Sequence, residues 1–449
     1  MPKRNIIWLL IGAVVVVLLL KAPESIVRRD QLYTQFGPLL DVRVQVRKHY
    51  VEPVDDAALL RGAIDGMLNR LDPYTMYFDE QEYEQFHQRT QGQFSGIGIE
   101  VGQGRTGGLV VISPIEGSPA FHAGLRAGDR ITRIDGRDTS NMSLAQGVRL
   151  IQGRAGTSVT LTIHRPSSDT TIEKVITRGL VTVRTVRGWA RDEDWHWDYL
   201  IDPEHRIGYI RISGFEAQTA EQFDEALTDL RGRQDVAALV IDVRDNPGGL
   251  LDVVANIVNR FIAEGVIVST RGQFSPEKVY TATRDEKYPP WPVAVLVNGG
   301  SASASEILAG ALQDHGRAVV VGEPTFGKGS VQELIQLENN NGAVKLTTAY
   351  YYLPKGERIH GRGIRPDVLV ELSPSERAAL VDSQQAVYST TAAPSSAPQG
   401  SAPATPELSS TPAADTAPAG AARAAAIPID RQLAEALAVL RARLATRPS

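Results

Sequence analysis

Between residues 207 and 322 the sequence alternates strand-like apolar runs with amphipathic stretches, and this alternation constrains the fold more than any other feature. The apolar runs cover residues 207–212, 237–243, 293–297 and 318–321. The stretches between them, at 221–230, 250–263 and 306–312, repeat their apolar residues with helical spacing. Alternating strands and helices of this kind predict an α/β core around a buried sheet.

The N-terminus predicts an export signal. Two basic residues precede residues 6–20, which are uncharged and almost wholly apolar, and Lys21 follows. Fifteen residues are fewer than the ~17–25 of a comfortable membrane span, but Trp8 and Lys21 suit the two interfaces. No cleavage site between small residues follows, so we expect residues 1–24 to be an uncleaved anchor, with a cleaved signal peptide as the alternative. The rest of the chain would then lie outside the cytoplasm, in a bacterial periplasm.

Composition divides the remaining chain into five predicted parts. Residues 25–91 have helical spacing, and 92–180 hold short β-branched runs between glycines. The α/β core follows at 181–383 and a linker at 384–427; from 389 to 426, 31 of 38 residues are Ala, Pro, Ser or Thr. Such a segment cannot bury enough apolar surface to offset its ordering entropy, so we expect it to be disordered. A last helix, at 428–449, is too short to be stable alone, so we expect it to dock on the protein's own body or on a partner.

Charge and cysteine content exclude several classes of function. The chain has 47 Lys and Arg against 52 Asp and Glu, a net charge of −5, which removes the simplest case for binding nucleic acid. The sequence contains no cysteine. Disulfides, thiolate catalysis and cysteine zinc sites are therefore excluded, and we expect no metal and no cofactor.

The glycine-bounded region carries a candidate peptide site. Gly96, Ile97, Gly98 and Ile99 form a Gly-x-Gly turn that enters a strand. Backbone N–H groups in such a turn can hold a terminal carboxylate, and the adjacent strand edge can pair with an extended peptide. Downstream, residues 123–136 read Ala-Gly-Leu-Arg-Ala-Gly-Asp-Arg-Ile-Thr-Arg-Ile-Asp-Gly. Together these runs resemble the PDZ domain family, which implies a β-rich α+β module.

Two polar motifs follow strands of the α/β core. Ser303 and Glu306 have the spacing of a capping box. A serine at a helix N-terminus is usually only a cap, but the same place suits a nucleophile because the helix favours a nearby oxyanion. Lys328 lies between glycines, in a near match to a phosphate-binding loop. The alternation after it predicts a strand, whereas a nucleotide loop opens a helix, so we interpret Lys328 as a solvated side chain or a general base.

These motifs resemble the carboxyl-terminal processing (tail-specific) serine proteases. The resemblance rests on Arg-Asp-Asn-Pro-Gly-Gly at 244–249, Ser-Ala-Ser-Ala-Ser-Glu at 301–306, Phe-Gly-Lys-Gly-Ser-Val-Gln at 326–332, and Gly-Ile-Arg-Pro-Asp at 363–367. It runs from about residue 32 to 372 and resumes at 430–437. It implies a ClpP/crotonase-like protease core with the PDZ domain inserted and a helical segment before it.

The resemblance also implies roles for individual residues. Ser303 corresponds to the nucleophile, Lys328 to the general base and Gln332 to a residue that orients the lysine. The N–H groups of Ala304 and Gly249, and less surely Gly248, correspond to the oxyanion hole. The residues alone do not separate Ser303 from Ser301 or Ser305. The implied function is a serine endopeptidase that binds the free, apolar C-termini of protein substrates through its PDZ domain.

Two alternatives stay open at this point. A Ser-His-Asp triad could recruit His315 and Asp242, although a histidine near a helix end is usually structural. The chain could also be a catalytically silent PDZ scaffold that binds protein C-termini. The sequence leaves open the substrates, an activating adaptor protein, and whether the N-terminal helices form a homo-oligomer.

Overall fold

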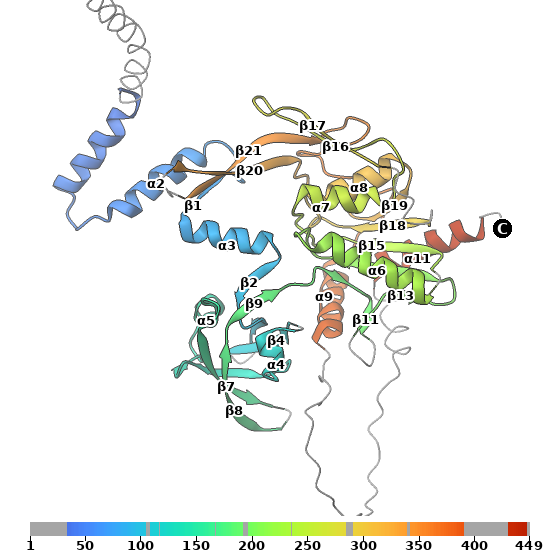
Figure 1. Cartoon of the computed structure of the whole chain (residues 1–449), viewed down its shortest axis with the longest axis horizontal. Helices are drawn as coiled ribbons and strands as arrows, with labels where there is room; N and C mark the ends of the chain where they lie inside the picture. Colours follow the sequence, from blue (N-terminus) through green and yellow to red (C-terminus); the bar gives the residue numbers. More distant parts are fainter. Residues whose placement is uncertain are drawn as a thin grey trace, which may run out of the picture. The chain divides into compact units, whose positions relative to one another are not determined.

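The computed structural model describes residues 34–104, 108–115, 117–166, 168–191, 196–234, 236–283, 291–338, 342–389 and 430–446. The chain forms two compact units, Met1–Tyr77 and Phe78–Ser449, and the boundary falls within β1 (Met76–Phe78) (Figure 1). The predicted anchor at residues 6–20 lies outside the described residues. No helix in the described ranges is both long and apolar enough to cross a membrane.

Two helices make up most of the described part of the first unit. One helix covers residues 34–49, and α2 (Asp56–Leu68) follows it. The Asp55 side chain accepts the N–H of Ala57 and so caps α2. Both helices lie within residues 25–91, the part of the chain with helical spacing in the sequence.

The second unit begins with α3 (Glu80–Thr90) and then enters a small β-rich module. The module is bounded by the antiparallel pair β2 (Gln93–Gly96) and β9 (Gly179–Thr182). Its sheet has the order β3-β4-β5-β7-β8, with β6 beside β5. The strands are β3 (Ile99–Gln103), β4 (Leu109–Pro114), β5 (Arg130–Ile134), β6 (Arg137–Asp138), β7 (Ser158–Arg165) and β8 (Thr170–Thr177), and the helices are α4 (Pro119–His122) and α5 (Leu144–Ile151). The module has its own apolar core, as we expect of the predicted PDZ fold.

A larger sheet forms the centre of the second unit. Its order is β10-β14-β15-β18-β19-β22, with β13 beside β14, and β14, β15, β18, β19 and β22 run parallel. The strands are β10 (Val186–Arg187), β13 (Leu200–Asp202), β14 (Ile207–Ile212), β15 (Ala238–Asp242), β18 (Val293–Val297), β19 (Ala318–Gly322) and β22 (Val368–Leu369). Every residue of β14, β15, β18 and β19 is buried, as parallel strands covered on both faces require. The predicted α/β core is confirmed.

Helices cover both faces of this sheet (Figure 1). Successive side chains of a strand point to opposite faces. Leu239 and Ile241 pack with α6 (Thr219–Gln234), α7 (Leu251–Asn259) and α8 (Ala304–Asp314). Val240 lies in a second cluster, with α11 (Arg431–Ala445). The C-terminal helix therefore docks on the protein's own body, one of the two outcomes expected from the sequence.

An antiparallel sheet completes the core. Its strands are β20 (Ser330–Gln336), β21 (Ala343–Tyr352), β16 (Val266–Arg271) and β17 (Lys278–Thr281), paired in that order. The short strands β11 (Ala190–Arg191) and β12 (Trp197–Asp198) pair with each other. The linker prediction was wrong at its start, because α9 (Pro374–Ser389) continues through residues 384–389. Those residues, Gln-Gln-Ala-Val-Tyr-Ser, lie at the very start of the Ala/Pro/Ser/Thr-rich run or before it, and they include no helix breaker.

Candidate active site

Three loops carry the predicted site residues, and each follows a strand of the central parallel sheet. The Asn-Pro-Gly-Gly turn follows β15, the loop to Ser303 follows β18, and the loop to Lys328 follows β19. These strands are adjacent and parallel, so the three loops emerge at one edge of the sheet. The carboxyl ends of parallel strands are where α/β folds place ligand sites.

Ser303 occupies a strained position at the N-terminus of α8. Its φ of 56° and ψ of −113° are unusual for a residue other than glycine. Its side chain lies beside the phenol of Tyr351 and acts to lower the pKa of that phenol. Because strain of this kind persists only where the surrounding structure enforces it, it is a feature of functional sites.

The two neighbouring serines have structural bonds. The hydroxyl of Ser301 donates to the carbonyl of Val243 over 2.8 Å. The hydroxyl of Ser305 donates to the carbonyl of Asn246 over 2.9 Å. Both serines are wholly buried and tie the loop that carries Ser303 to the turn after β15. The structure thus separates Ser303 from its neighbours, which the residues alone did not do.

A buried carboxylate links the loops of Ser303 and Lys328. Glu306 accepts the N–H of Ser303 at 2.8 Å, the N–H of Lys328 at 2.8 Å and the N–H of Gly327 at 2.7 Å. It also accepts the hydroxyl of Thr325 at 2.6 Å. Its side chain is wholly buried, and four donors offset the loss of solvation. The sequence predicted only the first of these contacts, as half of a capping box.

The glycines of the turn after β15 allow it to lie against Ser303. A Cβ at Gly248, where φ is 103°, would lie 2.7 Å from the Cβ of Ser303 and 2.9 Å from the nitrogen of Ala304. The N–H of Gly248 donates to the side chain of Asn246, so it is engaged within the turn. Within the described part of the chain, the N–H groups of Gly249 and Ala304 have no acceptor. These two amides are therefore free to bind a developing oxyanion.

One cavity of about 500 Å³ gathers most of the residues predicted for catalysis, although Ala304 is not among the residues that line it. Ser303, Lys328, Gln332, Gly248 and Gly249 all line it. Its other walls are Phe86, His87, Thr90, Phe215, Glu216, Pro247, Leu250, Leu334, Lys345 and Tyr351. Apart from Pro247, which lies in the motif at 244–249, the sequence analysis did not identify these residues.

Three side chains of the cavity have defined environments. Burial raises the pKa of Tyr351, whereas its interaction with the Ser303 side chain lowers that pKa. Burial has the larger effect, and the pKa is about 12. Burial also raises the pKa of Glu216, and within the described residues its buried Oε2 has no hydrogen-bond partner. The Nε2 of Gln332 donates to the hydroxyl of Ser330 at 2.8 Å.

The alternative Ser-His-Asp triad does not assemble. His315 is the C-terminal cap of α8, so about 16 Å of helix separates it from Ser303 at the other end. Its Nε2 lies 2.8 Å from the carbonyl of Val266. Asp242 is paired with Arg244 and Arg211. The prediction that His315 is structural is confirmed by this geometry.

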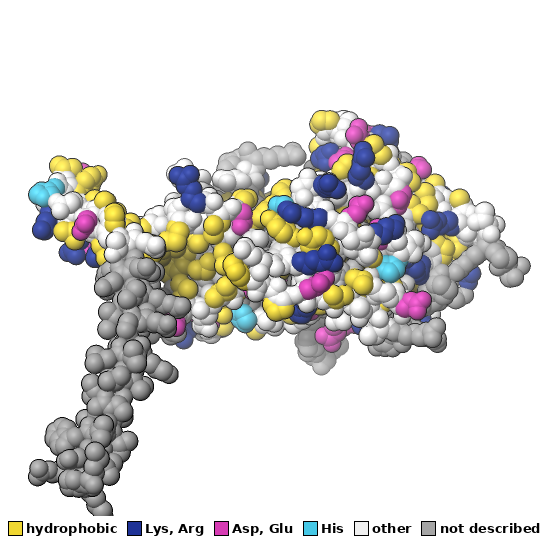
Figure 2. Space-filling view, turned by 90° about the horizontal axis from the view of Figure 1, so that it is seen from above, with side chains coloured by type: hydrophobic (Ala, Val, Ile, Leu, Met, Phe, Trp, Pro, Cys, Tyr) yellow, Lys and Arg dark blue, Asp and Glu magenta, His cyan; other side chains and the backbone are white. Residues whose placement is uncertain are grey.

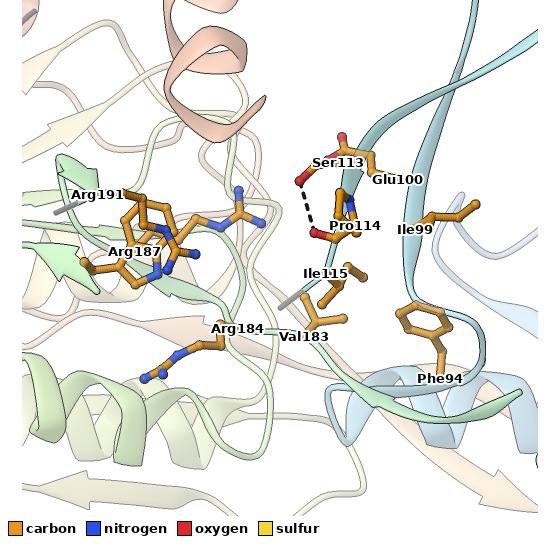
Figure 3. A pocket seen from close by; sticks show the side chains of 11 residues that line it. Phe94, Ile99, Glu100, Ser113, Pro114, Ile115, Val183, Arg184, Arg187 and Arg191 are labelled. Carbon is orange, nitrogen blue, oxygen red and sulfur yellow. Dashed lines mark hydrogen bonds between the residues drawn. The ribbon is translucent and has the colours of Figure 1, made fainter. Parts of the chain in front are cut away.

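The predicted peptide site lies at the entry to β3. Gly96, Ile97 and Gly98 are buried and Ile99 begins β3, which pairs with β4 and lies at the end of its sheet. A second cavity of about 380 Å³ opens beside Ile99. Figure 3 shows Arg184, Arg187 and Arg191 on one side of it and side chains of the β-rich module on the other. Arg184 pairs with Glu225 at 2.6 Å, and Glu100 lines the same cavity, so arginine and carboxylate side chains both lie near the start of the predicted peptide strand.

The described residues also bear on two further requirements, those of a metal site and those of a basic surface. Within those residues, no three His, Asp or Glu side chains are grouped so that they could hold a metal ion. On the face that Figure 2 shows, Lys and Arg are interspersed with Asp and Glu.

Comparison with known proteins gives three family matches. A model described as Peptidase family S41 matches residues 206–370. A model described as PDZ domain matches residues 110–165. A third, described as Activating protease CtpB N-terminal domain, matches residues 39–82.

Individual proteins match over most of the chain. The "Carboxy-terminal-processing protease" of Bartonella bacilliformis is 39% identical over 378 residues, which are 82% of this chain and 83% of that protein. The "Carboxy-terminal processing protease CtpB" of Bacillus subtilis is 38% identical over 330 residues, 73% of this chain and 66% of that protein. A solved structure, "Photosystem II D1 C-terminal processing protease", is 34% identical and covers 74% of this chain and 86% of its own, with a TM-score of 0.43.

Proposed function

Because the chain belongs to the carboxy-terminal processing proteases of peptidase family S41, we propose that it cleaves its substrates with the pair Ser303 and Lys328. The protein is a serine-type peptidase with a PDZ domain. This assignment confirms the resemblance that the sequence motifs indicated. The residue roles, the binding of substrate tails and the location of the protein are proposals.

The nucleophile is assigned from the different surroundings of the three serine hydroxyls. Ser301 and Ser305 use their hydroxyls to hold the loop. Ser303 instead lines the cavity that also contains Lys328. Glu306 accepts the backbone N–H groups of both residues, so one carboxylate fixes the two loops relative to each other.

The proposed reaction is acyl transfer in two steps. Neutral Lys328 takes the proton of the Ser303 hydroxyl as its oxygen attacks the peptide carbonyl. The oxyanion that forms lies against the N–H groups of Ala304 and Gly249. Collapse breaks the peptide bond, the amine leaves with a proton from Lys328, and water then releases the acyl group. Gln332 supports the loop of Lys328 from β20.

The PDZ domain selects the substrate. A free C-terminus would bind the backbone at Gly96, Ile97 and Gly98, and the preceding residues would pair with the edge of β3. Arg187 and Arg191 line the cavity beside Ile99, together with Glu100 (Figure 3), and arginines near the turn favour a carboxylate.

We also propose two coarser features. The core has the ClpP/crotonase type of fold, supported by parallel strands covered on one face by α6, α7 and α8. The protein is held at the periplasmic side of a bacterial inner membrane by residues 6–20, supported by their apolar run behind two basic residues. Fractionation tests the second point, and mature soluble chains that begin near residue 22 would contradict it.

Mass spectrometry of intact substrates tests the catalytic assignment. A reporter protein with a short apolar C-terminal tail is incubated with wild type, Ser303→Ala, Lys328→Ala and His315→Ala. We expect new fragments with wild type and His315→Ala, and a loss of about 10³-fold or more in rate with the other two variants. Near-native turnover by Lys328→Ala would refute the pair.

A silent PDZ scaffold is the remaining candidate from the sequence. It predicts that wild type binds tail peptides without cutting them. The same experiment decides this, because intact reporter in every sample together with bound tail peptide would favour the scaffold.

A further inference from the structure

The C-terminal helix α11 begins at a buried cluster of charges that includes Arg244, close in sequence to the turn that carries Gly249. Asp430, which caps α11 through the N–H of Leu433, receives both terminal nitrogens of Arg244 at 2.9 and 2.8 Å. Gln432 accepts from the same guanidinium at 3.1 Å. Arg244 and Asp430 are only 1% and 5% exposed. Nearly two hundred residues of sequence separate the partners of this contact.

The cluster is balanced in charge. Arg244 also donates to Asp242, at 2.7 Å through one terminal nitrogen, and Arg211 approaches the same carboxylate at 3.4 Å. Two arginines therefore face two aspartates. Burial opposes ionisation of Asp242, but Arg244 and Arg211 together lower its pKa to about 2. Removing one carboxylate from such a cluster leaves an uncompensated buried cation.

Arg244 is the first residue of the turn that faces Ser303. Its carbonyl accepts from Arg211 at 3.3 Å. Asn246 follows, and its side chain bonds the carbonyl of Ile212 on one side and the N–H of Gly248 on the other. The carbonyl of Asn246 accepts the N–H of Ala302 in the nucleophile loop. A shift of Arg244 would therefore move the turn relative to Ser303.

We propose that Asp430 and Gln432 are positioning residues for catalysis: α11 clamps Arg244 and thereby holds the Gly249 amide where it can bind the oxyanion. The inference rests on the proposed roles of Ser303 and Gly249. It predicts an effect on one step of the reaction. The clamp should act on the tetrahedral state and leave binding of the unreacted peptide almost unchanged, because neither residue lines the catalytic cavity.

Variants of the full chain test the clamp. Asp430→Asn removes its charge, Asp430→Glu restores it, and Gln432→Leu removes one neutral contact. Arg441→Ala is the matched control, because Arg441 pairs α11 with Asp202 at 2.8 Å, away from Arg244. For each, kcat and KM are measured with a tail peptide, along with the affinity for a peptide aldehyde, which forms an oxyanion with the nucleophile. All assays are run at a temperature where circular dichroism shows every variant folded.

We expect Asp430→Asn to lose about tenfold or more in kcat and in aldehyde affinity, with KM changed less than about threefold. Asp430→Glu should recover part of the loss, Gln432→Leu should show a smaller loss of the same pattern, and Arg441→Ala should keep kcat within about twofold. Equal losses of kcat in Asp430→Asn and Arg441→Ala would overturn the proposal. An unchanged kcat in Asp430→Asn would also overturn it. So would a weakening of substrate binding in Asp430→Asn, seen as a raised KM, that matches its loss of aldehyde affinity. Activity in Ser303→Ala would instead refute the catalytic assignment itself. If Asp430→Asn does not fold, an unchanged kcat in folded Gln432→Leu overturns the clamp.

Discussion

Three serines lie within five residues of sequence, and their hydroxyls have different partners. Ser301 and Ser305 bond carbonyls of the neighbouring turn, whereas Ser303 faces the cavity and Tyr351. A sequence alone does not distinguish them, because all three have the same side chain and alternate with small residues in one short run. Their partners come from the turn after β15 and from β21, so the choice depends on tertiary structure.

Tyr351→Phe tests whether the phenol beside Ser303 acts as a base. Burial raises the pKa of Tyr351 to about 12, so the phenol is neutral near neutral pH and cannot accept the proton. We expect this variant to keep kcat within about tenfold of wild type, with the acid limb of its pH profile unmoved. The measurement is kcat/KM between about pH 5 and 9. An acid limb that disappears in Tyr351→Phe would assign the base to the phenol.

Arg211→Met tests the electrostatics of Asp242. The ordinary pKa of an unfolded aspartate is about 3.9. In the folded chain, burial acts to raise the pKa of Asp242, but Arg244 and Arg211 outweigh burial and lower that pKa to about 2. The stabilisation is therefore complete above about pH 4 and is lost as the pH falls towards 2. We expect the unfolding free energy of wild type to exceed that of Arg211→Met at pH 5, and the difference to shrink towards pH 2. Denaturant titrations measure it, and a difference independent of pH would contradict this account.

Helices and strands of the core follow from local pattern. The apolar runs predicted β14, β15, β18 and β19 almost to the residue, because strands buried on both faces are apolar throughout. Short strands such as β10 and β13 carry no such signal, since their pairing with β14 defines them. The start of the linker was misplaced because α9 continues through residues that are neither strongly apolar nor helix breakers.

Leu437→Ala tests whether α11 is part of the core. Leu437 is 1% exposed in the cluster formed with β15, β18 and β19. We expect this substitution to lower the free energy of unfolding by about 2–5 kcal/mol, from lost burial and the cavity left behind. Arg443→Ala, at an exposed position of the same helix, should change it by less than about 0.5 kcal/mol. Equal, small effects in urea titrations would show that the helix is not docked in solution.

The active site is a property of the whole second unit. Its cavity takes residues from α3, the turn after β15, the start of α8, and the hairpin of β20 and β21. The resemblance supplied Ser303, Lys328 and Gln332 because their motifs are local in sequence. His87, Glu216 and Lys345 belong to no such motif, and the register of β20 against β21, with Ser330 opposite Tyr350, is needed to place Tyr351.

Gly98→Ala tests whether the PDZ domain makes cleavage depend on a free C-terminus. Gly98 has φ 77°, and a Cβ there would lie 2.2 Å from the Cβ of Ser118, so the turn at the entry to β3 must move. Gly136→Ala is the control: its φ is 76°, in the same module, but nothing lies within 4 Å of its Cβ. Both variants carry the same backbone strain, and only the first displaces the turn. With wild type and Gly136→Ala we expect amidation of a substrate's C-terminus to lower kcat/KM by about tenfold or more, because the amide lacks the carboxylate charge. With Gly98→Ala the free acid should be cleaved almost as slowly as the amide, and an undiminished effect of amidation in that variant would place recognition of the terminus elsewhere.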